Sequence, residues 1–319
     1  MSQVAKVHLF SGFLGVGKTT VLKGLMHQKP TSEKWVVIVN EFGEIGIDGA
    51  VLTQDDIPIA EIVGGCLCCV AGPQMTITVA KLLRQHRPDR LLIEASGLAH
   101  AATVINELKR QPLGKSIVIG TIFTMIDPRQ FMNPEYEKLP LYQDQVNIAD
   151  VLMVTKIANC DALLLADFYK RIFQVFPSKA KIIEVGFDVV QKKPDLFDLA
   201  CLEIETIVRP SSKYQVMHPI DLSHEMKSFQ SEGFIFDEAH IFIEASLLHF
   251  FNKLPKLCSG LVRAKGVFRV LDKWLWINWV ADNLDVKPIA WSRDSRFELI
   301  AQEIDAPMIT QHLNACYLR

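Results

Sequence analysis

Three cysteines lie within four positions of this chain. They are Cys66, Cys68 and Cys69, and the pair Gly64 and Gly65 precedes them. Thiolates are soft ligands that suit zinc or Cu(I), and Cys66 and Cys69 have the C-x-x-C spacing of many zinc half-sites. The glycines permit the tight backbone that brings thiols together. These residues therefore form a candidate transition-metal site.

The fourth ligand and the rival interpretations stay open. Only three sulfurs are local, so a tetrahedral site needs one more group, from Glu41, Glu44, water or a partner protein. The cysteines could instead be small buried hydrophobes, or Cys66 and Cys69 could form a redox pair. Three thiols beside two glycines favour the metal site. An open fourth position suits a carrier, because the metal must leave.

A second stretch has the residue types of a phosphate-binding loop. Residues 12–19 read GFLGVGKT, which fits G-x-x-x-x-G-K-[ST] between an apolar run and a helical pattern. The backbone there can turn its N–H groups towards phosphate oxygens. Lys18 then contacts the β and γ phosphates, and the Thr19 hydroxyl faces Mg²⁺. The other nucleotide-binding residues expected in the loop are Gly12, Gly15, Val16 and Gly17.

Polar residues follow four other apolar runs, where ligands of open α/β sheets gather. Residues 40–44 (NEFGE) carry two carboxylates that could steer a metal or water, although a plain polar loop is the alternative. Glu94 could hold the Mg²⁺ shell, and the Gly97 N–H could approach a γ-phosphate. Asp127 ends another run. Thr155 and Lys156 end a further one, where the lysine stem could lie against a nucleobase.

Short apolar runs alternate with helical patterns over the first two hundred residues. Runs that are apolar throughout are typical of parallel strands buried on both faces, and the alternation predicts an α/β domain. The expected strands are 4–10, 35–40, 90–95, 116–127, 150–156 and 181–185. The expected helices are 18–28, 74–86, 102–110, 142–148 and 161–175.

The pattern changes after residue 208. Residues 209–226 include prolines and small polar residues and are predicted to be a linker between a first domain, 1–208, and a second, 227–319. Strands close in sequence predict an antiparallel sheet with helices on one face. The expected elements are helices 237–254 and 306–317 and strands 266–270, 274–280 and 297–302.

Bulk composition excludes several classes of protein. A chain of 319 residues with a net charge of −2 does not fit a nucleic-acid binder held by a basic surface. No apolar stretch is long enough for a membrane span, and the first residues do not form a signal peptide. We therefore expect a cytoplasmic protein with reduced thiols that binds neither nucleic acid nor membrane.

Five motifs in order give the chain a resemblance to a known family. GFLGVGKTT, NEFGE, GGCLCC, IEASG and ADVLMVTK resemble the CobW-type GTPases, SIMIBI-class P-loop proteins that include YjiA-like proteins and the nickel chaperones HypB and UreG. Residues 263–266 (RAKG) before an apolar run resemble the small CobW C-terminal domain, so the resemblance covers nearly the whole chain. It implies a P-loop domain with a mainly parallel sheet, followed by a smaller α+β domain.

The resemblance also implies an activity and site residues. It implies slow, Mg²⁺-dependent GTP hydrolysis coupled to handling of a transition metal, commonly zinc and sometimes cobalt. Glu94 would be the Walker-B-like carboxylate and Gly97 the γ-phosphate sensor. The residues that would hold phosphates and Mg²⁺ are Gly15, Gly17, Lys18, Thr19 and Thr20.

Two departures from the family pattern matter. The position before the Asn40-Glu41 pair is Val39, where the family usually has glutamate, so one potential metal ligand is missing. The guanine-reading loop usually runs Thr/Asn-Lys-x-Asp, and here its last position is Ala158. Losing that bidentate acceptor should weaken the preference for guanine, which leaves ATP as an alternative to GTP. The spacing gives no support for Asp161 as a substitute.

The sequence therefore predicts a metal-binding nucleotide hydrolase that acts as a switch. Bound nucleotide and Mg²⁺ would order the loops around Glu41, Glu44 and Glu94, and hydrolysis would change metal affinity or docking to a client metalloprotein. Zinc or another divalent transition metal is the expected cargo, and a homodimer could complete the site. The rivals are a P-loop phosphotransferase with a small acceptor and a binding module without catalysis.

Overall fold

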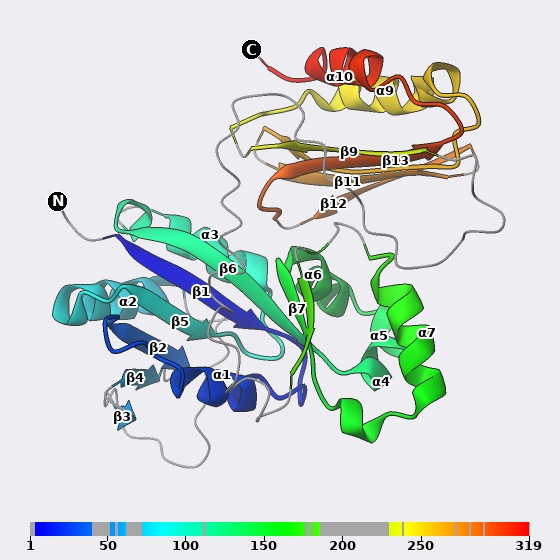
Figure 1. Cartoon of the computed structure of the whole chain (residues 1–319). Coiled ribbons are helices and arrows are strands. Elements are labelled where there is room, and N and C mark those ends of the chain that lie inside the picture. The colour runs from blue at the N-terminus through cyan, green and yellow to red at the C-terminus, as the bar shows by residue number, and fades with distance from the viewer. Residues whose placement is uncertain are drawn as a thin grey trace. The chain divides into compact units, whose positions relative to one another are not determined.

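The chain forms two compact units in a computed structural model (Figure 1). One comprises residues 1–169 and 179–202, the other residues 170–178 and 203–319. The described residues are 4–39, 52–54, 57–61, 72–110, 113–175, 179, 181–185, 230–237, 239–271, 273–280, 282–289 and 291–318. The predicted linker, 209–226, lies outside them, so the boundaries 1–208 and 227–319 stay predictions.

The first unit is built on an eight-stranded sheet with the order β3-β4-β2-β5-β1-β6-β7-β8. Seven of these strands are parallel, and only β3 runs antiparallel to its neighbour β4. The strands are β1 (Ala5–Ser11), β2 (Trp35–Val39), β3 (Leu52–Gln54), β4 (Ile57–Glu61), β5 (Arg90–Glu94), β6 (Ile117–Ile126), β7 (Val151–Val154) and β8 (Lys181–Glu184). The predicted mainly parallel α/β sheet is confirmed.

Helices cover both faces of this sheet (Figure 1). Apolar side chains of α1 share one hydrophobic cluster with side chains of β1, β2 and β5. Strands β2 and β5 are buried along their whole length, as is typical of parallel strands covered on both faces. The helices are α1 (Lys18–Met26), α2 (Gly72–His86), α3 (Ala101–Lys109), α4 (Pro128–Phe131), α5 (Pro134–Glu137), α6 (Pro140–Ile148) and α7 (Ala162–Ile172), with short 3-10 turns η1 (Leu113–Lys115) and η2 (Ile157–Asn159).

The pattern misses several elements of this unit. Strands β3 and β4 were not expected, since Pro58 interrupts the β4 sequence; β4 pairs with β2 on one side and with the short β3 on the other. Helices α4 and α5 each begin with proline at the first helical position, and Asp127 and Asn133 cap them through bonds from Arg129 N and Glu135 N. These two turns follow directly after β6 in the chain.

The second unit is a five-stranded antiparallel sheet with the order β12-β11-β10-β13-β9. Among the described residues of this unit, helices α9 (Glu244–Leu257) and α10 (Ala306–Asn314) lie on one face of the sheet, as the sequence predicts (Figure 1). The strands are β9 (Gln230–Phe236), β10 (Arg263–Val270), β11 (Lys273–Val280), β12 (Asn283–Ile289) and β13 (Ser295–Ala301). The α+β class predicted for this part of the chain is confirmed.

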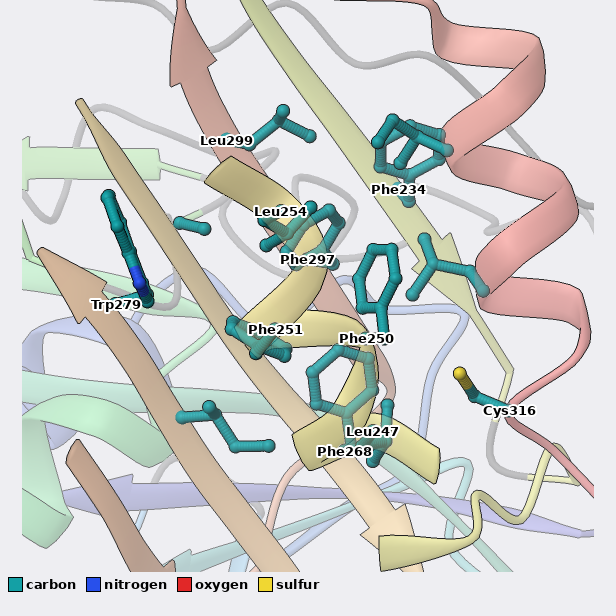
Figure 2. Close-up of a cluster of buried hydrophobic side chains, with 14 of the residues drawn as sticks. Phe234, Leu247, Phe250, Phe251, Leu254, Phe268, Trp279, Phe297, Leu299 and Cys316 are labelled. Atoms are coloured by element: carbon teal, nitrogen blue, oxygen red, sulfur yellow. The ribbon is translucent and has the colours of Figure 1, made fainter. Parts of the chain in front are cut away.

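Aromatic side chains fill the core between this sheet and its helices (Figure 2). Phe251 of α9 lies 5.4 Å from Phe297 and 5.9 Å from Phe268, both ring pairs edge to face. Such rings bury enough area to hold a small sheet and two helices together. The remaining aromatic members include Phe234, Phe236, Phe242, Phe250 and Trp279.

Three details of this unit differ from the prediction. The first helix starts at Glu244 rather than at residue 237, because Asp237 accepts a bond from Ala239 N in a turn and Phe242 bridges to Tyr317. Strands β9 and β12 were not expected. Strand β12 alternates polar and apolar residues and includes Pro288, which fits its position at the edge of the sheet.

Lys265 on β10 gives this unit a testable pH dependence. Burial lowers the pKa of its ammonium from 10.5 to about 8, with Arg263 acting in the same direction and Glu298 opposing. Between pH 8 and 10.5 the folded chain releases this proton before the unfolded chain does, so stability gains a contribution as pH rises. Relative to Lys265→Met, the unchanged chain should gain about 1 kcal/mol in unfolding free energy over this window, a value discounted for partial solvation.

Tryptophan fluorescence during urea unfolding measures this difference. Four of the five tryptophans lie in the second unit, so the emission reports mainly its unfolding. Lys253→Met, which removes an exposed lysine of α9, controls for the loss of one charge. If the unfolding free energies of the unchanged chain and of Lys265→Met change in parallel from pH 7.5 to 10, Lys265 is not the cause of the pH dependence of stability.

Within the described residues, no helix combines the length and apolar character that crossing a bilayer requires.

Candidate nucleotide site

The loop between β1 and α1 has the backbone of a phosphate-binding turn. Gly12, Gly15 and Gly17 have φ angles of 137°, 72° and 91°, which side-chain-bearing residues rarely adopt. A Cβ on Gly12 would lie 2.6 Å from the Met125 carbonyl oxygen, so β6 approaches the loop too closely for any other residue. Helix α1 starts directly after Gly17 without a side-chain cap. The first N–H groups of the helix can therefore donate hydrogen bonds to a bound anion.

Helices that follow β6 hold the tip of this loop. The Gln130 amide donates to the Leu14 carbonyl at 3.1 Å. The Phe13 ring contacts Tyr136 and Tyr142 edge to face, at 5.4 and 5.9 Å between centroids. The predicted P-loop thus has a fixed shape, set by residues far along the chain.

Lys18 lies buried beneath the loop that it is predicted to serve. Its ammonium donates to the carbonyl oxygens of Gly12 at 3.0 Å and Phe13 at 3.1 Å. Burial lowers the pKa of this ammonium, and the nearby charge of Glu94 opposes the shift. A cation held in this position places its charge where phosphate oxygens would meet the loop.

Thr19 and Glu94 meet at the carboxyl end of β5. The Thr19 hydroxyl donates to Glu94 Oε1 at 2.7 Å. Burial raises the pKa of the Glu94 carboxyl, while the bond from Thr19 and the charges of Lys18 and Lys23 lower it. Its second oxygen, Oε2, is buried and has no hydrogen-bond partner among the described residues. A hydroxyl beside a carboxylate oxygen that lacks a partner is a donor set that fits Mg²⁺.

Gly97 packs directly against the P-loop. A Cβ on Gly97 would lie 2.7 to 2.9 Å from Leu14, including its main-chain N and Cα. The Gln145 amide on α6 donates to the carbonyls of Gly97 at 3.2 Å and Ala99 at 3.1 Å. The loop after β5 is therefore held from two sides. The sequence does not single out Gln145, because a glutamine inside a helical pattern gives no signal of what it contacts.

The loop after β7 joins the same site from the other side. The Thr155 hydroxyl donates to the carbonyl oxygens of Val16 at 2.8 Å and Ile126 at 3.2 Å. Lys156 follows in the left-handed conformation, with φ of 55°, and its Nζ lies 3.9 Å from Asp127 Oδ2. The structure thus brings Thr155 to the P-loop backbone and leaves the Lys156 stem half-exposed.

The predicted ligands of the transition metal are not among the described residues that form this nucleotide site. Glu41, Glu44, Cys66, Cys68 and Cys69 all lie outside the described residues. Among those that the structure describes, no three His, Cys, Asp or Glu side chains cluster in a way that could hold a metal ion. Thr20 is exposed in the first turn of α1. The metal ligands and the role of Thr20 therefore stay predictions.

Comparison with known proteins agrees with this architecture. Residues 6–184 match the family described as CobW/HypB/UreG, nucleotide-binding domain, and residues 231–317 match the cobalamin synthesis protein cobW C-terminal domain. The zinc chaperone YeiR of Escherichia coli (strain K12) is 30% identical over 314 residues, which cover 93% of each chain. The zinc chaperone CobW of a Sinorhizobium species is 30% identical over 184 residues, covering 48% of this chain and 51% of that protein.

A solved structure shows the same fold. A Zn(II)-bound triple mutant of the YjiA GTPase superposes with a TM-score of 0.50 at 18% identity, covering 98% of this chain and 99% of that one. Together with the matches to both domains, this confirms the predicted resemblance. The chain belongs to the CobW/HypB/UreG family and combines its nucleotide-binding domain with a CobW C-terminal domain.

Proposed function

We propose that this chain hydrolyses GTP with Mg²⁺ and uses the reaction to control its hold on a divalent transition metal, zinc. The observation that carries the proposal is the Thr19 and Glu94 pair beneath an intact P-loop, with the buried charge of Lys18 beside it. Two relatives are described as zinc chaperones, which supports zinc as the cargo. A client metalloprotein would then receive the metal, and a second copy of the chain could complete the site.

The chain's own residues would divide the work as follows. The N–H groups at the start of α1 bind phosphate oxygens, and Lys18 stabilises charge on the β and γ phosphates. Thr19 and Glu94 would hold Mg²⁺, which neutralises charge on those oxygens when bound. Glu94, or another carboxylate nearby, orients the attacking water. Gly97 positions its N–H beside the γ-phosphate because Leu14 and Gln145 fix its loop.

The metal half of the proposal rests on sequence. Cys66, Cys68 and Cys69 supply three thiolates, and Glu41 or Glu44 is the candidate for the fourth ligand. These segments follow β2 and β4, two strands of the sheet that also carries the P-loop. A change in those segments on hydrolysis would alter the geometry of the thiolates and release the metal.

Zinc titration of the full-length, reduced protein tests the coupling. With Mg²⁺ present, zinc affinity is measured by chelator competition without nucleotide, with GDP, and with a non-hydrolysable GTP analogue. We expect one zinc per chain and an affinity that differs at least about fivefold between the GDP and analogue states. Exchanging Cys66, Cys68 and Cys69 together for serine should cost more than about a hundredfold in zinc affinity. Cys160→Ser is the matched control, because Cys160 is only partly buried and lies outside the motif.

Rival functions give different results in the same preparation. A phosphotransferase would hydrolyse little GTP until an acceptor is added, and a binding module would bind GTP without turnover. Zinc affinity that ignores the nucleotide, or that survives loss of all three cysteines, would exclude the proposed carrier.

A further inference from the structure

The base-binding end of the nucleotide site is formed by the loop after β7. Thr155 is tied to Val16 of the P-loop, so a base attached to P-loop-bound phosphates would reach Lys156. Lys156 has the left-handed backbone conformation, and its Nζ lies 3.9 Å from Asp127 Oδ2. A lysine stem presents an apolar face to any purine and does not distinguish one from another.

Guanine and adenine differ in what they donate. Guanine presents N1–H and the N2 amino group side by side, and a carboxylate accepts from both at once. Adenine has no N1–H and presents its amino group at a different position. Selection for guanine therefore needs a carboxylate at the base edge. Two residues beyond Lys156, the chain has Ala158, whose methyl group is exposed and accepts nothing.

The nearest carboxylate in sequence is already engaged. Asp161 Oδ1 accepts from Leu164 N at 2.8 Å, and its carbonyl accepts from Leu165 N at 3.1 Å. This is the geometry of a helix N-cap, so the carboxylate is committed to the start of α7. Turning it to a base would expose the first turn of α7 and cost the cap.

The carboxylate that approaches Lys156, Asp127, is engaged as well. Asp127 is buried, and both of its oxygens bind the Arg129 guanidinium, at 3.0 and 2.7 Å. Asp127 Oδ1 also accepts from Arg129 N at 3.0 Å as the cap of α4. A bidentate arginine pair of this kind leaves little capacity for two further donors.

We propose that this site binds adenine and guanine nucleotides with affinities that lie within about tenfold of each other. The inference rests on the proposed nucleotide site and names its substrates more closely, as purine nucleoside triphosphates rather than GTP alone. Among the described residues of this loop, the Lys156 stem can offer an apolar face to a purine ring, and main-chain carbonyl oxygens can accept from the amino group of either purine.

Competition binding of GTP and ATP to the full-length protein with Mg²⁺ tests this. The unchanged chain should show affinities within about tenfold of each other, and Ala158→Asp should raise the GTP preference at least about tenfold. Ala158→Asn, which has nearly the same shape without the charge, should raise it less. Asp161→Asn keeps a residue that caps helices well and should leave the ratio unchanged.

The outcomes separate this inference from the proposed function. A GTP preference above about tenfold in the unchanged chain overturns the inference and leaves the proposed function intact. If Asp161→Asn abolishes that preference, the Asp161 carboxylate accepts hydrogen bonds from the guanine. If neither nucleotide binds, the proposed function itself fails. Should Ala158→Asp not fold, judged by circular dichroism, the ratio in the unchanged chain and the Asp161→Asn result still decide.

Discussion

Replacing Lys18 with methionine is expected to weaken nucleoside triphosphate binding at least about a hundredfold and to abolish measurable hydrolysis. The ammonium is buried, so its attraction to phosphate is screened less than at an exposed site. Methionine fills a similar volume but cannot donate to the Gly12 and Phe13 carbonyls. The loop would lose its internal donors as well as its charge, and Glu94 would lose a neighbouring cation.

Isothermal titration calorimetry with a non-hydrolysable GTP analogue measures the loss in nucleotide affinity, and an assay of phosphate release measures turnover. Lys23→Met makes the same chemical change in the last turn of the same helix and should retain binding. Thermal unfolding of both variants separates a lost ligand contact from a lost fold. Binding by Lys18→Met within tenfold of the unchanged chain would mean that the loop does not hold phosphate as proposed.

Replacing Glu94 with glutamine is expected to reduce the rate of hydrolysis by about 10² to 10³ while nucleotide still binds. The amide oxygen can still accept from the Thr19 hydroxyl, but the charge that would attract Mg²⁺ is gone. The Mg²⁺ concentration for half-maximal activity should rise. Since the carboxylate is buried, the variant should be no less stable than the unchanged chain.

Single-turnover hydrolysis over a range of Mg²⁺ concentrations measures this effect. Glu107→Gln removes a carboxylate that pairs with Arg110 on α3 and controls for the change of one charge. If Glu94→Gln hydrolyses GTP at the unchanged rate and Mg²⁺ dependence, another group holds the ion and the proposed role of Glu94 is wrong.

The sequence predicts the site wherever its signals are local. The glycines, Lys18 and Thr19 are recognisable because a phosphate loop needs fixed residue types at fixed spacing. Strands β2, β5 and β7 are recognisable because both of their faces are buried and their residues are apolar throughout. The position of Glu94 follows from the same reasoning, since it ends one of these strands.

Contacts between distant residues could not be predicted in this way. Nothing in the residue types of Gly97 and Leu14 indicates that their main chains touch, and nothing in α6 indicates that Gln145 holds the loop after β5. An aspartate before a helical pattern is a capping signal, and Asp161 takes that role at the start of α7, which the resemblance to a base-reading loop obscures. The metal ligands remain a prediction from sequence.

The contact between Gly97 and Leu14 has a thermodynamic consequence. The two main chains are too close for one loop to move far without displacing the other. Any ligand that shifts the loop after β5 therefore also shifts the phosphate loop and changes the affinity for nucleotide. By linkage, bound nucleotide changes the affinity for that ligand by the same factor. If metal and nucleotide both act on these loops, the factor by which metal changes nucleotide affinity equals the factor by which nucleotide changes metal affinity.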